Sequence, residues 1–154
     1  MQGAFCHPFQ MGPLDLFSED FYQTRKNIIK KRMVALNGNE KEIKKQFLSI
    51  YQEKESIANQ FVFWDLLTPE LLEFALKCIP SKHLAPIFER MFWGLKDNCS
   101  GFPDLISFSK DSNYYEMIEI KGPGDKLQKN QTRWFQYFKL HDIPCKLIHV
   151  EYKQ

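Results

Sequence analysis

The sequence predicts an α/β protein in which a mainly helical half, residues 1–100, precedes a small mixed sheet with flanking helices, residues 101–154. Apolar residues recur at helical spacing through the first half. Two runs rich in β-formers then flank a turn, and an amphipathic segment and a third such run follow them. A strand that follows a helix normally crosses over to lie parallel to its partner, so we expect a mixed sheet of about three strands.

Four helices are expected in the first half, and each carries a start or stop signal. Ser18 has the character of an N-cap, and Asn37-Gly38 ends the first helix. Thr68-Pro69-Glu70 combines a cap, a proline at the first position and an acid in the first turn. Pro86 disturbs the fourth helix near its start. The expected spans are 18–36, 40–60, 68–79 and 81–94.

Two segments of the first half are expected to lie outside these helices. The aromatic stretch 61–67 holds Trp64 and is predicted to be core. Residues 95–101 are predicted to be the loop that delivers the chain to the sheet.

The second half is predicted as strand, turn, strand, helix and strand. A short apolar run follows Asp104, the Ser/Asp/Asn-rich segment 109–113 forms a turn, and 114–121 returns as a strand. The spacing of Asp125 and Gln128 predicts a capping box for a helix that runs to about Leu140. Gln131 falls on the inward face of that helix, among apolar neighbours. The last strand is expected over 145–152.

Asp104, Glu119 and Lys121 are the candidate catalytic residues. In a hairpin this tight, Asp104 at the outer end of the first strand lies opposite Glu119, and Glu119 and Lys121 project to the same face. Two carboxylates and one ammonium in a small volume suit the hydrolysis of a phosphodiester, because Mg²⁺ prefers hard oxygen ligands and lowers the pKa of attacking water. The alternative is that Glu-x-Lys marks only a solvated strand face.

The composition describes one well-packed domain, predicted over 1–154, with 44% hydrophobic and 15% aromatic residues. No segment has the length of a transmembrane span or the pattern of a signal peptide, so no membrane partner is expected. The net charge of +2 does not by itself indicate a nucleic-acid partner, but basic residues cluster. The clusters suit either a phosphate backbone or solvated helix faces, and they comprise residues 25–32, 41–45 and 121–133.

The cysteines and histidines indicate no catalytic or metal centre. The four cysteines are irregularly spaced and lack a Cys-x-x-Cys pair, so we expect reduced thiols in an intracellular compartment, cytoplasmic or nuclear according to host. His149 is interpreted as a structural residue of the last strand. No histidine forms a recognisable triad with a serine or a cysteine.

The motifs 101-GFPDLISF-108, 116-EMIEIKGPGDKL-127 and 131-QTRWF-135 resemble the VRR-NUC branch of the PD-(D/E)XK nucleases, and especially the C-terminal nuclease domain of the Fanconi-associated nucleases. The likeness reaches back to 13-PLDLFSEDFY-22 and forward to His149-Val150. It implies a restriction-endonuclease-like core that uses Mg²⁺ or Mn²⁺. It also implies cleavage of branched, flapped or end-containing DNA, with 5′-flap endonuclease and 5′-to-3′ exonuclease activity in interstrand crosslink repair.

The resemblance also assigns roles to residues of this sequence. Asp104 and Glu119 bind the metal, joined by the backbone carbonyl of Ile120, while Lys121 positions the nucleophile and Gln131 supports the site. We expect three basic residues to contact nucleic acid: Lys126, Lys129 and Arg133. Asp125 is interpreted as a cap.

One further ligand of the family is not expected in this chain. In the long members an acidic residue on a helix upstream of the region matching 13-PLDL-16 completes the metal site, and the given sequence begins after it. Glu19, Glu53 or Glu55 replaces it only if the fold brings one of them to the hairpin. The rival hypothesis is therefore a DNA-binding fragment, weak or inactive in catalysis, that needs a missing N-terminal part. The oligomeric state and the preferred DNA structure do not follow from the sequence.

Overall fold

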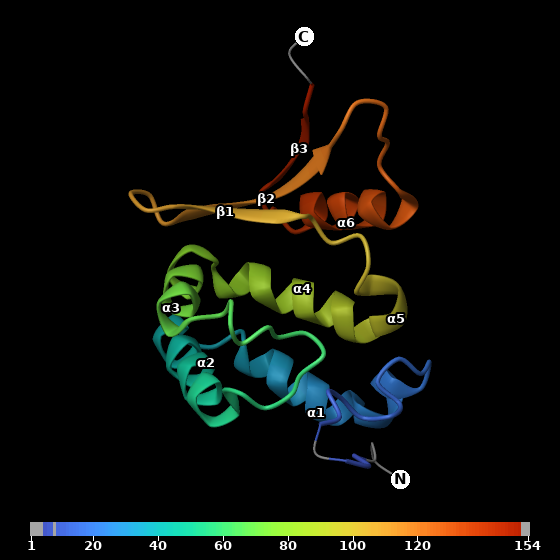
Figure 1. Ribbon diagram of the computed structural model, residues 1–154. Coiled ribbons are helices and arrows are strands. Elements are labelled where there is room, and N and C mark those ends of the chain that lie inside the picture. Colours follow the sequence, from blue (N-terminus) through green and yellow to red (C-terminus); the bar gives the residue numbers. More distant parts are fainter. Residues whose placement is uncertain (1–4, 8, 152–154) are drawn as a thin grey trace. The chain divides into compact units, whose positions relative to one another are not determined.

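The computed structural model describes residues 5–7 and 9–151, and the chain divides into two compact units, Met1–Leu95 and Lys96–Gln154 (Figure 1). This division falls close to the predicted change from a helical to a sheet-containing half. That the two units form one domain stays a prediction. Within the described residues, no helix combines the length and the apolarity needed to cross a membrane.

The first unit consists of four helices: α1 (Phe21–Ala35), α2 (Glu40–Lys54), α3 (Pro69–Cys78) and α4 (Ser81–Trp93). Helix α1 packs on α4, and α2 packs on α3. Thr68 caps α3 as predicted, because its hydroxyl oxygen accepts the Leu71 N–H at 3.2 Å. Apolar side chains such as Ile43 and Tyr51 of α2 form the core of this unit.

Three sequence-based expectations for the first unit are corrected. Helix α1 begins at Phe21 with Asp20 as its N-cap, so Ser18 forms a preceding turn. Helix α2 ends at Lys54 rather than near residue 60, because Ser56 adopts the left-handed conformation with φ 66°. The segment 61–67 is irregular and largely exposed rather than core. Phe63, for example, keeps 74% of its surface in solvent.

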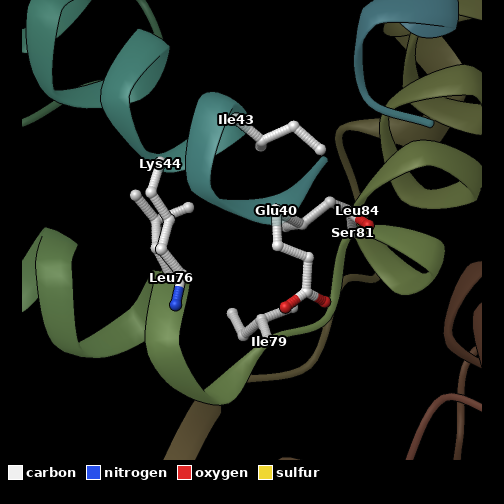
Figure 2. Close-up of a pocket in the computed structure, with 7 residues that line it drawn as sticks. All are labelled: Glu40, Ile43, Lys44, Leu76, Ile79, Ser81 and Leu84. Carbon is white, nitrogen blue, oxygen red and sulfur yellow. The ribbon is translucent and has the colours of Figure 1, made fainter. Parts of the chain in front are cut away.

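A small crevice lies between α2, α3 and the start of α4 (Figure 2). Its walls are mainly aliphatic, with Glu40 and Lys44 beside them. The cavity has a volume of about 10 Å³, which is the space of about one water molecule. It is therefore a packing gap rather than a substrate site.

The second unit is a three-stranded sheet in the order β1 (Leu105–Ser109), β2 (Tyr114–Lys121) and β3 (Cys145–His149), with helix α6 (Lys129–Leu140) between β2 and β3. Strands β1 and β2 pair antiparallel, and β2 and β3 pair parallel, so the predicted mixed sheet is confirmed. Asn113 closes the hairpin with φ 48°, a conformation that asparagine tolerates well. The expected strand 145–152 ends earlier, and residue 152 lies outside the described part of the chain.

Two expectations beside the sheet are also corrected. The predicted loop 95–101 contains a short helix, α5 (Leu95–Asn98). Helix α6 is capped by Gln128 and not by Asp125, whose carboxylate instead accepts the Gly122 N–H at 3.1 Å. The Asp125 side chain thus closes the 122–125 turn, and the helix starts four residues later.

Helix α6 covers the face of the sheet that carries the odd-numbered residues of β2. Tyr115, Met117, Glu119 and Lys121 are all buried on that face. In the helix, Trp134 and Phe138 keep 1% and 0% of their surfaces exposed. Strand β2 is therefore both the centre of the sheet and the strand that presents the candidate site to the helix.

Candidate active site

The hairpin register brings Asp104 to Glu119, as predicted. Leu105, the first residue of β1, pairs with Ile118, so Asp104 lies opposite Glu119, one position before β1 begins. An oxygen of the Asp104 carboxylate accepts the Ile120 N–H at 3.0 Å. The side chain of Asp104 therefore adds one hydrogen bond to the ladder just before β1 begins.

Pro103 lies outside the paired residues of the hairpin. The antiparallel register begins at Leu105, which pairs with Ile118, and proline has no N–H to extend the ladder. The Asp104 carboxylate binds the Ile120 N–H at this end of the sheet.

Glu119 is a fully buried carboxylate on the helix-covered face of β2. Its residue exposure is 0%, and that of Lys121 is 8%. The Lys121 Nζ lies 2.8 Å from Glu119 Oε1, and the Gln131 side-chain amide donates to the same oxygen. The other oxygen, Oε2, is buried and has no hydrogen-bond partner among the residues that the structure describes. A buried, unsatisfied carboxylate oxygen is costly, so this atom is suited to a cation that arrives from outside the chain.

Gln131 holds Glu119 from the first turn of α6. Its amide oxygen accepts the Gln128 backbone N–H at 2.9 Å, which closes the N-terminus of the helix. Because the oxygen is engaged there, the amide nitrogen must face Glu119. The inward orientation predicted from the helical spacing is confirmed, but the capping box was predicted for Asp125 and Gln128 and is formed by Gln128 and Gln131.

Phe102 is a further residue of the site region that the sequence analysis missed. Its ring meets those of Trp134 and Phe138 edge-on, with centroid distances of 5.0 and 5.7 Å. The aromatic residue next to the Pro-Asp pair was the available signal. The contact fixes the segment before Asp104 onto α6, the helix that also carries Gln131.

The three predicted nucleic-acid contacts, Lys126, Lys129 and Arg133, are exposed in the second unit. Lys129 is the first residue of α6 and Arg133 lies one turn further along the same side. Lys126 lies in the preceding loop. An exposed helix N-terminus flanked by cations is a favourable place for a phosphate group.

No third carboxylate joins Asp104 and Glu119 within the described part of the chain, where no three His, Cys, Asp or Glu side chains form a cluster. Glu53 is paired with Lys54 at 2.6 Å, and Glu55 accepts the Tyr51 hydroxyl at 3.0 Å. His149 pairs with Lys121 in the register of β2 and β3 and is exposed at the strand end.

A mixed sheet whose central strand carries a buried glutamate and lysine beside an aspartate is the arrangement expected of a nuclease. The comparisons with known proteins agree. Residues 38–152 match the model of the VRR-NUC domain, and the chain belongs to this family of nucleases. The resemblance seen in the sequence is thereby confirmed.

The similar proteins are Fanconi-associated nucleases and their homologues. The chain is 39% identical over 150 residues to a Fanconi-associated nuclease 1 homolog of Pseudomonas aeruginosa, covering 97% of this chain and 26% of that protein. It is 31% identical over 137 residues to the homolog of Arabidopsis thaliana, covering 86% of this chain and 15% of that protein. The chain thus spans about a quarter or less of the length of these relatives.

A solved structure shows the same fold. The crystal structure of paFAN1 bound to 5′-flap DNA with a gap matches with a TM-score of 0.87 and 38% identity, over 98% of this chain and 28% of that one. The predicted fold, a small mixed sheet with flanking helices, is confirmed by this match.

Proposed function

We propose that this chain is a metal-dependent DNA nuclease that hydrolyses phosphodiester bonds in branched or 5′-flap DNA. The observation that carries the proposal is the buried Glu119, held on one oxygen by Lys121 and Gln131 and unsatisfied on the other. A buried carboxylate oxygen without a partner is costly, and a bound cation would satisfy it.

The residues present fit Mg²⁺ or Mn²⁺. Asp104 and Glu119 supply two carboxylates from opposite positions of the hairpin, and the backbone carbonyl of Ile120 would be a third ligand; oxygen atoms of this kind are the hard ligands that these cations prefer. A bound cation would neutralise charge on the phosphate and lower the pKa of a water molecule. These three groups would hold it in place.

Lys121 would act on the attacking water. Its ammonium already lies 2.8 Å from Glu119, which fixes it on the same face as the carboxylates. From there it can donate to the water oxygen or to a phosphate oxygen, and so stabilise the charge that develops in the transition state. Gln131 keeps Glu119 in place and would support the site without contacting the substrate.

Lys126, Lys129 and Arg133 would bind the DNA backbone. All three are exposed, and two of them lie at the N-terminal end of the helix that supports the site. The similar structure named above holds 5′-flap DNA, which supports a flap substrate for this chain. By the same analogy we include 5′-to-3′ exonuclease activity and a role in interstrand crosslink repair in the proposal.

The test is cleavage of an end-labelled 5′-flap duplex with Mg²⁺ or Mn²⁺. Asp104→Ala and Lys121→Ala should abolish cutting while leaving DNA binding intact. Lys110→Ala, in the exposed hairpin turn, is the matched control and should cut like the native chain. Cutting that survives both site variants would refute the assignment of the active site.

A second candidate function is a DNA-binding module that needs another polypeptide to complete its metal site. It is favoured by the absence of a third carboxylate near Asp104 and Glu119 among the described residues. Under this alternative the native chain binds flap DNA and does not cut it, and the Asp104 and Lys121 variants bind equally well. Replacing Lys126, Lys129 and Arg133 together should weaken binding under both hypotheses and reduce its salt dependence.

A further inference from the structure

A hydrogen-bonded bridge ties the loop before Asp104 to the start of α6. The Asn130 side-chain amide donates to the Ser100 hydroxyl oxygen at 2.7 Å. The Ser100 hydroxyl in turn donates to the Asp97 carbonyl at 3.3 Å, within α5. Ser100 therefore links the end of one helix to the start of another, four residues before Asp104.

The backbones of the two segments touch at this bridge. Gly101 adopts φ 77°, and a Cβ placed on it would lie 2.7 Å from the Asn130 carbonyl carbon and 2.8 Å from the Gln131 nitrogen. Only glycine allows such an approach. The side-chain bridge thus lies where the loop and the helix are already in direct contact, and it fixes one against the other.

Each side of this contact leads to one carboxylate of the proposed cation site. The loop continues through Phe102 to Asp104, whose carboxylate reaches the Ile120 N–H. On the helix, Asn130 directly precedes Gln131, whose amide holds Glu119. The hairpin register places Asp104 opposite Glu119, and the contact between the loop and α6 adds a second restraint on the position of Asp104 relative to Glu119.

We propose that Ser100 and Asn130 are positioning residues that set the position of Asp104 relative to Glu119. They touch neither the substrate nor the cation, and they act through the loop that carries Asp104. The part of this inference that concerns the cation rests on the proposed function. The part that concerns Asp104 is measurable without any metal.

The bridge is suited to fine positioning because the fold does not depend on it. Phe102 already anchors the loop through Trp134 and Phe138 in the core. Ser100 is exposed, so its loss leaves no buried group unsatisfied. Losing a neutral hydrogen bond of this kind changes an equilibrium by about fivefold.

The first readout is hydrogen exchange of the Ile120 amide, measured by NMR on the metal-free chain. Ser100→Ala and Asn130→Ala should each speed its exchange by about fivefold, because Asp104 releases this N–H more often. The double variant should match Ser100→Ala, which already removes the bond that Asn130→Ala removes. Ser100→Thr restores the hydroxyl and should exchange like the native chain.

Two controls separate positioning from a general loss of stability. Thr132→Ala removes a hydroxyl that donates to the carbonyl of Gln128, the N-cap of α6, and should leave Ile120 unchanged. The Met117 amide, which donates to the Pro144 carbonyl at 2.9 Å, should keep its exchange rate in every variant. Faster exchange at Met117 as well would overturn the proposal in favour of a purely structural role.

The second readout is the affinity for Mn²⁺, measured by electron paramagnetic resonance of the free ion. Ser100→Ala and Asn130→Ala should weaken binding by about fivefold in the native background and have no effect when Asp104 is already Asn. A native chain that binds no Mn²⁺ would refute the nuclease proposal and, with it, the cation part of this inference. Unchanged Ile120 exchange in Ser100→Ala would overturn the inference and leave the nuclease proposal standing.

Discussion

Gln131 serves two partners at once, and its replacement by methionine should destabilise the second unit. The substitution removes the acceptor of the Gln128 N–H and the donor to Glu119. Losing a helix cap costs about 1 kcal/mol, and losing a hydrogen bond to a charged group costs about 1.5–3 kcal/mol. Because Gln131 is half-buried, we expect a total of roughly 2–3 kcal/mol, a large share of the ~5–15 kcal/mol that stabilises a typical domain.

Two further variants separate the two halves of this effect. Gln131→Lys keeps a donor for Glu119 and loses the acceptor of the cap, so its cost should be about 1 kcal/mol. Thr132→Ala changes the neighbouring residue without touching either bond, and should cost less than about 0.5 kcal/mol. If the Gln131 amide bridges both partners, the loss in free energy of unfolding should be largest for Gln131→Met, smaller for Gln131→Lys and smallest for Thr132→Ala.

The assay is urea unfolding followed by the fluorescence of Trp134, in a background where Trp64 and Trp93 are replaced by phenylalanine. Trp134 is 1% exposed within the second unit, so its emission reports the unfolding of that unit. A Gln131→Met variant whose free energy of unfolding lies within about 0.5 kcal/mol of the parent, or a Gln131→Lys variant that loses as much as Gln131→Met, would contradict the bridging role of Gln131.

Three other predictions concern stability. Gly101→Ala should cost more than Gly124→Ala in a thermal melt, because both glycines have positive φ but only the Cβ at Gly101 would collide with backbone; equal losses would contradict this. Phe138→Ala, at a fully buried site, should lower the free energy of unfolding in urea by about 3–5 kcal/mol, and a loss below ~1 kcal/mol would show that the site is not core. The Arg25 guanidinium lowers the pKa of Asp15, so this pair stabilises the fold above the ordinary pKa of 3.8 and is lost as the pH falls through the lowered value. Asp15→Asn should therefore melt earlier than the native chain at pH 7 and equally at low pH, whereas a difference that persists at low pH would contradict the pair.

The hairpin was predictable from the sequence because it is local. Asp104 and Glu119 are separated by two short strands and the four-residue turn 110–113, so the alternation of side chains and the turn residues were enough to place them together. The cap of α3 was predictable for the same reason, since Thr68 and Leu71 are three residues apart.

Two errors show where local sequence patterns are not sufficient. Asp125 has the spacing of a helix cap, but it also lies three residues after Gly122, and the turn recruits its carboxylate. The aromatic segment 61–67 has the composition of a core segment, yet most of it is exposed. The prediction was wrong because composition alone does not say whether other parts of the chain pack against a segment.

The sequence by itself therefore determined the order of the main elements and the family, and it predicted the residues of the candidate site. Only the tertiary structure decided how those residues are held: which oxygen of Glu119 is satisfied, which partner each end of the Gln131 amide takes, and where the loop before Asp104 meets α6. The physical reason is that periodicity and turn chemistry act over a few residues, whereas burial and hydrogen bonding join groups that are distant in the chain.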